Sequence, residues 1–138
     1  MIYNLMLFVD WPAESLKDTV TLCVITDDPD VSRPFAELAG KTVRSKTLMT
    51  QRRAPLAKID DCDAVFLSGL DESLLADKLA SVAGLPVLTL ASSPGSGAMI
   101  DLALAGERIV FDVSATRLRS AGLSLASRVM QLARKVHH

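Results

Sequence analysis

Aspartates cluster at Asp27, Asp28 and Asp30, directly after an apolar run that predicts a strand at residues 20–25. Ligands bind beyond the carboxyl ends of parallel strands in open α/β sheets, and adjacent carboxylates there can hold a divalent cation. A phosphorylatable aspartate site would need a further aspartate after the next central strand, where the sequence has Ser68. We therefore expect no metal, and two interpretations of Asp27 and Asp28 remain: a ligand cleft, or turn and helix-capping residues.

The glycine- and serine-rich segment 91–98 follows a predicted strand and is a second candidate for chemistry. Backbone N–H groups of such a loop can cradle a phosphate, with Ser92, Gly95 and Gly97 lying near Ser68. The segment lacks the Lys-Ser/Thr ending of a P-loop, and no G-x-G-x-x-G pattern opens a helix. The composition favours a surface loop, and the ligand cleft is the alternative.

Side chains for acid–base or nucleophilic catalysis are scarce. The only histidines, His137 and His138, end the chain, and we interpret them as the remnant of a purification tag, with a native tail as the alternative. The rest of the sequence therefore lacks the commonest general base and metal ligand. The two cysteines, Cys23 and Cys62, do not form a C-x-x-C motif. The sequence thus predicts a protein that is not an enzyme and holds no cofactor.

Four cations, Arg44, Lys46, Arg52 and Arg53, lie in a weakly alternating segment that predicts an edge strand or hairpin. Charges on an edge strand protect the sheet from pairing with other chains. The same four side chains can instead contact an anionic ligand or an acidic partner.

The fold prediction starts from residues 64–68, an apolar run too continuous to alternate between core and water. Such a run is typical of a strand buried on both faces in a parallel sheet. Asp71 or Ser73 can cap the following helix, Gly84 ends it, and residues 87–90 form the next strand. Residues 99–104 and 108–113 predict an antiparallel hairpin at one edge, because only a short turn joins them. We expect an α/β three-layer sandwich, with a largely parallel sheet and helices on both faces.

Four further helices complete the expected fold, one of them over residues 114–120, where Gly122 ends it. The first has Ile2 and Val9 on its buried face, and Trp11 packs against the sheet or the last helix. The second is capped by Ser32, and the last begins at Ser124 with an apolar face that extends to Val136.

Length and charge set the remaining limits. At 138 residues we expect one domain, residues 1–138. The net charge of −1 argues against nucleic-acid binding, which needs a basic surface. No apolar run reaches the about 18–20 residues that span a bilayer, so no membrane insertion is expected. The sequence also shows no signal peptide.

Three separated groups of residues together resemble the YfiR/HmsC family of small periplasmic regulatory proteins. They read YNLMLFVDWP at 3–12, LAGKTV at 38–43 with DCDAVFLS at 61–68, and GAMIDL at 97–102 with RIVFDV at 108–113. The family's usual residues differ at four positions, which here are Ala98, Asp101, Ser114 and Ala126. The resemblance covers nearly the whole chain in the family's order.

This resemblance implies a non-enzymatic protein of the periplasm, whose signal peptide has been removed. Such a protein binds the periplasmic domain of an inner-membrane diguanylate cyclase, represses it, and so lowers cyclic-di-GMP and biofilm formation. A homodimer is also expected from the family. A small-ligand (nucleotide or metabolite) binding domain and an enzyme of unrecognised type are the alternatives.

The two cysteines allow two interpretations. With the common strand order 2-1-3-4-5, Cys23 and Cys62 lie on or beside neighbouring strands, so they can form a disulfide or remain two buried thiols. The periplasmic location implied by the resemblance favours the disulfide.

Overall fold

The computed structural model describes residues 2–12, 17–93 and 95–137, so Met1 and His138 lie outside the described residues. Its elements, in chain order, are α1 (Ile2–Met6), β1 (Val9–Asp10), β2 (Thr19–Ile25), α2 (Pro29–Ala36), β3 (Thr42–Val43), β4 (Lys46–Arg53), β5 (Ala64–Leu67), α3 (Glu72–Ser81), β6 (Leu88–Ala91), β7 (Ile100–Ala105), β8 (Arg108–Ser114), α4 (Ala115–Ser120), β9 (Ser124–Leu125), α5 (Ser127–Met130) and β10 (Lys135–His137). The mixed α/β class expected from the sequence is confirmed.

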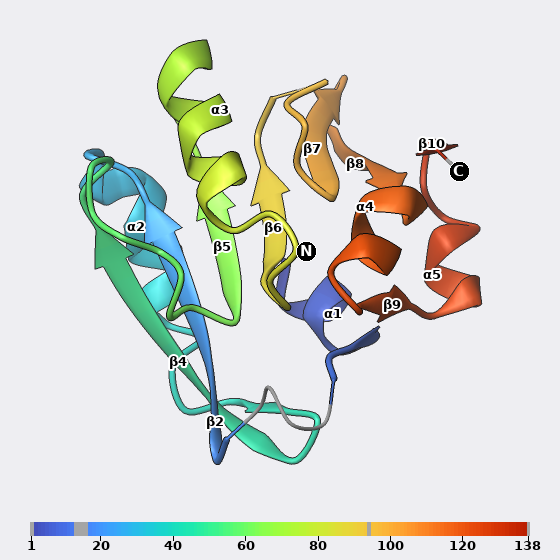
Figure 1. Ribbon diagram of the computed structural model, residues 1–138, viewed down its shortest axis with the longest axis horizontal. Coiled ribbons are helices and arrows are strands. Elements are labelled where there is room, and N and C mark those ends of the chain that lie inside the picture. Colours follow the sequence, from blue (N-terminus) through green and yellow to red (C-terminus); the bar gives the residue numbers. More distant parts are fainter. Residues whose placement is uncertain (1, 13–16, 94, 138) are drawn as a thin grey trace.

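Within the described ranges, eight strands form one curled sheet in the order β10-β8-β7-β6-β5-β2-β4-β3 (Figure 1). Adjacent strands from β4 through β2, β5 and β6 to β7 are parallel. This part has the predicted 2-1-3-4-5 order when its strands are numbered along the chain. The β3–β4 and β7–β8 pairs are antiparallel hairpins, and β10 pairs with β8 in parallel.

Both faces of the central strands are buried, as the apolar run at 64–68 predicts. In β5, Ala64 and Phe66 belong to one hydrophobic core, whereas Val65 and Leu67 belong to the other. This division follows from the two-residue side-chain period of a strand. Figure 1 shows the consequence: α3 lies in front of the sheet at β5, and α2 lies behind β2 and β4.

The helix ends follow local capping rules. The Asp71 carboxylate accepts a hydrogen bond from the N–H of Leu74 at 2.8 Å, so Asp71 is the cap of α3. Asp28 caps α2 in the same way, accepting the N–H of Asp30 at 2.9 Å. The prediction that Ser32 caps this helix is therefore wrong, because α2 begins three residues earlier at Pro29, which suits a first helical turn.

The N-terminal segment packs against the C-terminal one. The predicted helix is present but ends at Met6, and buried Val9 pairs with Leu125 in an antiparallel ladder between β1 and β9. Trp11 is only 8% exposed, as predicted, and its indole N–H donates to the carbonyl oxygen of Asp63 at 3.0 Å. This hydrogen bond connects the residue that follows β1 to the residue that precedes β5.

The predicted last helix from Ser124 to Val136 is wrong. Its residues form β9, the four-residue α5 and β10. The reason is tertiary: β8 offers an open strand edge to β10, and Arg134 pairs with Asp112 of β8 at 2.8 Å. The prediction that the β7–β8 hairpin forms the edge of the sheet is also wrong, because β10 pairs with β8 and is itself the edge strand.

Candidate functional site

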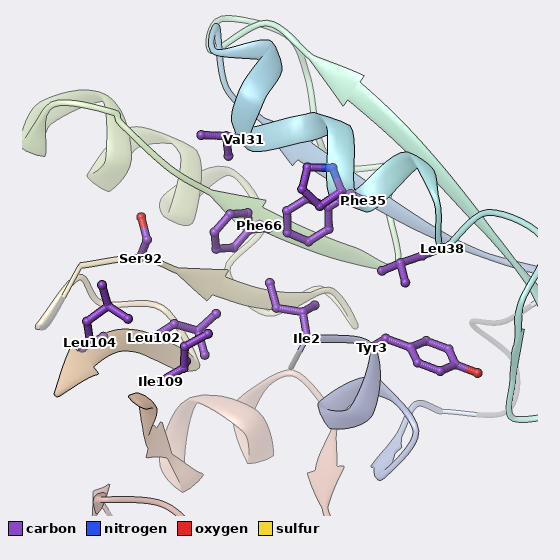
Figure 2. Close-up of a pocket in the computed structure, with 12 residues that line it drawn as sticks. Ile2, Tyr3, Val31, Phe35, Leu38, Phe66, Ser92, Leu102, Leu104 and Ile109 are labelled. Atoms are coloured by element: carbon purple, nitrogen blue, oxygen red, sulfur yellow. The ribbon is translucent and has the colours of Figure 1, made fainter. Parts of the chain in front are cut away.

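A long apolar groove runs between α2, α1 and the β7–β8 hairpin and has a volume of about 870 Å³. Figure 2 shows its lining, with α2 side chains facing those of the hairpin across Phe66 of β5. The lining residues come from separate parts of the chain and are Ile2, Tyr3, Val31, Pro34, Phe35, Leu38, Phe66, Ser92, Leu102, Ala103, Leu104 and Ile109. None of these described residues carries a charge.

The α2 side of the groove exists because this helix is only half covered. Val31, Phe35 and Leu38 follow a helical spacing and pack against the core, yet none of them is fully buried. Phe35 and Phe66 hold their ring centroids 5.2 Å apart with planes tilted by 32°, a favourable aromatic contact. The helix therefore presents the rest of its apolar face to the groove.

The opposite side is formed by the solvent-exposed end of the β7–β8 hairpin. Leu104 and Ile109 are directly opposite each other in the ladder, and they are 74% and 48% exposed. Single exposed leucines are common on proteins, but a contiguous concave apolar surface marks a binding site. This hairpin end thus extends the apolar surface of α2 across the groove.

Two polar groups border this apolar surface. The Ser92 hydroxyl donates to the Ser68 hydroxyl oxygen at 3.2 Å, where β5 and β6 end. The Tyr3 hydroxyl donates to the carbonyl oxygen of Thr42 at 2.9 Å. A ligand or partner that enters the groove would therefore meet apolar walls with hydroxyl groups, an arrangement suited to binding.

The residues predicted for a ligand cleft do not all meet. Of the six, only Ser92 lines the groove, with Ser68 hydrogen-bonded to it. Asp28 is used as the helix cap, and Asp27 precedes it on the surface. Gly95 and Gly97 line a different cavity, near the C-terminus.

The four predicted cations are divided between the two ends of β4. Arg44 forms an ion pair with Asp10 at the β3–β4 turn. At the other end, Arg53 donates to both carboxylate oxygens of Asp61 at 2.6 and 3.0 Å. These hydrogen bonds lower the pKa of Asp61 and raise that of Arg53. Lys46 and Arg52 lie within β4, so the described structure does not bring all four into one patch.

A disulfide joins Cys23 in β2 to Cys62 just before β5, with the two Cα atoms 6.1 Å apart. Both residues are buried beneath the α3 side of the sheet. The bond therefore crosses between two neighbouring parallel strands, as the strand order allows.

The described residues lack two further features that would point to a function. No group of three or more histidine, cysteine, aspartate or glutamate side chains there is placed to hold a metal ion. Within the same ranges, no helix has the length and apolarity needed to cross a membrane.

The groove itself was not predicted from the sequence. Its signals were present, since Val31 and Phe35 share a face of α2 and Leu38 follows just after the helix. Leu104 and Ile109 are apolar residues near a turn. Each signal also fits ordinary core residues, so only their juxtaposition in space reveals the site.

Comparison with known proteins gives one family. The family described as YfiR/HmsC-like matches residues 1–134, which includes every element that borders the groove. No curated protein matches the chain.

Proposed function

The chain belongs to the YfiR/HmsC-like family, and from this membership we propose that it is a periplasmic regulator that binds and represses an inner-membrane diguanylate cyclase. Repression would lower cyclic-di-GMP and biofilm formation. The disulfide between Cys23 and Cys62 supports an oxidising compartment such as the periplasm. In this proposal the protein acts by binding its partner and not by catalysing a reaction.

The uncharged groove between α2 and the β7–β8 hairpin is the observation that supports a binding surface at this place. Interface energy concentrates in well-packed, desolvated pockets near the centre of a contact. An amphipathic helix of the cyclase's periplasmic domain suits this geometry, since its apolar side chains can enter between Phe35 and Leu104. Binding there would bury the exposed apolar hairpin end, which explains why those residues are tolerated on the surface.

Leu104→Glu tests this surface, and Leu132→Glu is its matched control. Leu104 and Leu132 are 74% and 75% exposed, so neither substitution places a charge in the core. Only Leu104 lines the groove. Placing a charge in an apolar contact should weaken binding by about 2 kcal/mol or more, which is about thirtyfold.

The measurement has two stages. Purified chain should capture from membranes a protein with a diguanylate cyclase domain, and its affinity for that cyclase's periplasmic domain is then compared among the variants. In cells, Leu104→Glu should raise cyclic-di-GMP, whereas Leu132→Glu should leave it at the parental level. Equal affinities for the parent and Leu104→Glu would refute the groove as the contact, and failure to capture a cyclase would refute the partner.

A small-ligand binding domain is the second candidate. The groove volume of about 870 Å³ lies within the range of known ligand pockets, roughly 300–1,000 Å³. A thermal-shift screen of nucleotides and metabolites tests it, because a ligand at about 100 times its Kd adds about 2.7 kcal/mol of stability. A hit that Leu104→Glu abolishes would favour this function over protein binding.

Three proposals about organisation remain. The chain length supports one domain over residues 1–138, the pattern of strands and helices supports a three-layer arrangement around the sheet, and the family supports a homodimer. Light scattering on purified protein measures the oligomeric state directly. A monomer at micromolar concentration would contradict the homodimer.

A further inference from the structure

A second cavity, of about 590 Å³, lies at the end of the sheet near β10 and shares no lining residue with the groove. It is bordered by the glycine- and serine-rich loop, the start of α4 and the C-terminal strand. Its charged lining residues are Asp101, Asp112, Arg117, Arg134 and Lys135, with His137 at the border. Three cations and two carboxylates give this lining a net positive charge.

Both carboxylates already have protein donors. Asp112 accepts hydrogen bonds from Nε and Nη2 of Arg134 at 3.1 and 2.8 Å, so this pair is neutral. Asp101 accepts the Gly95 N–H at 3.0 Å and the Ser96 hydroxyl. The Asp101 hydrogen bonds connect the loop to β7, and those of Arg134 connect the residue before β10 to β8.

Two lining cations lie outside these hydrogen-bonded pairs, although the charge of Lys135, opposite Asp112 in the β8–β10 ladder, also acts on that carboxylate. Neither Arg117 nor Lys135 forms an ion pair with any residue that the structure describes. The Arg117 guanidinium lies near its own helix start, with Nη1 3.4 Å from the hydroxyl oxygen of Ser114. An arginine that uses one terminal N–H in this way retains its other N–H donors for a planar or tetrahedral anion.

The loop adds backbone donors to these charges. Gly95 and Gly97 both have positive φ values, +66° and +93°, a conformation that side chains disfavour. Consecutive N–H groups in such turns form concave sites for anions. The sequence suggested a phosphate cradle here, but only the fold places Arg117 and Lys135, from a distant part of the chain, beside it.

We propose that this cavity binds a phosphate monoester. Arg117 and Lys135 supply the charge for the phosphate. The loop supplies the backbone N–H groups of Ser96 and Gly97, since the Gly95 N–H already donates to Asp101. The volume exceeds that of a phosphate group, so it also admits the rest of a small phosphorylated molecule. The remaining lone pairs of the Asp101 carboxylate oxygens can accept hydrogen bonds that hydroxyl groups of that molecule donate. This site is separate from the groove, and its test requires no cyclase.

The test is an NMR titration of the purified full chain with inorganic phosphate and with glycerol 3-phosphate, at low ionic strength. We expect saturable shifts of the Gly95 and Gly97 amides, with tighter binding of glycerol 3-phosphate. Added salt should weaken the binding because the attraction is largely electrostatic. Arg117→Ala and Lys135→Ala should each weaken it, the former by about tenfold or more, since an arginine provides charge-assisted hydrogen bonds.

Arg119→Ala is the matched control, because Arg119 lies on the same helix as Arg117 but does not line the cavity. It removes the same charge and should leave the affinity within about twofold of the parent, the scale of a surface substitution. Equal weakening by Arg117→Ala and Arg119→Ala would overturn the proposal, since it would indicate only general electrostatic attraction. Shifts that do not saturate, or that map away from the loop, would overturn it as well.

Discussion

Replacing Trp11 with alanine should destabilise the protein severely. Trp11 is the only tryptophan, 8% exposed, and part of the core that lines the α1 and α2 side of the sheet. Truncation of a buried aromatic side chain to alanine typically costs about 3–5 kcal/mol, because it removes apolar contacts and leaves a cavity. For a chain of 138 residues this corresponds to a fall in Tm of about 10–15 °C.

Trp11→Phe separates the hydrogen bond from the packing. The Asp63 carbonyl oxygen accepts the indole N–H at 3.0 Å and also the backbone N–H of Leu88 at 2.9 Å. Phenylalanine therefore leaves this oxygen with one donor, and the loss should be about 1 kcal/mol for the hydrogen bond, with a smaller packing term. The expected order of stability is parent, Trp11→Phe, then Trp11→Ala.

The assay is thermal and urea unfolding followed by circular dichroism, which does not depend on the tryptophan that is removed. Leu56→Ala serves as the control, because Leu56 is 84% exposed and its loss should change stability by less than about 0.5 kcal/mol. If Trp11→Ala melts within about 2 °C of the parent, Trp11 does not support the core, and a role in partner binding becomes the better explanation.

Two further predictions concern the disulfide and one ion pair. Reducing the Cys23–Cys62 bond, or replacing both cysteines with alanine, should lower the free energy of unfolding by up to about 4 kcal/mol. This is the chain-entropy value for a sequence separation of 39. An unchanged Tm in reductant, with thiol counting to prove that the bond is reduced, would contradict this prediction. The hydrogen bonds from Arg134 hold the pKa of Asp112 in the folded protein below its usual value. The ion pair therefore stabilises the fold fully at pH values above the pKa of the unfolded state. This contribution is lost as the pH falls through the lowered pKa of the folded state. The Tm of the parent should therefore fall below about pH 4. Asp112→Asn should have a lower Tm at neutral pH, and its Tm should fall less steeply in acid. Parallel profiles of Tm against pH for the two proteins would refute this contribution.

Much of the fold could be predicted from local sequence. The apolar run at 64–68 predicts a strand buried on both faces, and Asp71 predicts the helix start that follows it. These predictions succeed because side-chain period and capping depend on neighbours along the chain. The 2-1-3-4-5 order then brings Cys23 and Cys62 within bonding distance.

The C-terminal segment shows where local sequence is insufficient. Leu125, Val129, Leu132 and Val136 have a helical spacing, yet the chain forms β9, a single short helix and β10. The pairing of Val9 with Leu125 and the open edge of β8 decide this, and neither is visible in the segment itself. Tertiary hydrogen bonds outweigh a helical preference of a few tenths of a kcal/mol per residue.

The sequence by itself determined the central strands of the sheet, the start of α3 and the family resemblance, whereas only the tertiary structure decided β9, β10 and the two cavities. The groove joins residues as distant as Ile2 and Ile109, and the second cavity joins Gly95 to Lys135. A local pattern fixes whether a side chain points toward a core or toward solvent. The side chains that face one another across a cavity come from distant segments, and the packing of these segments decides which of them meet. A binding surface made from several segments therefore exists only in the folded chain.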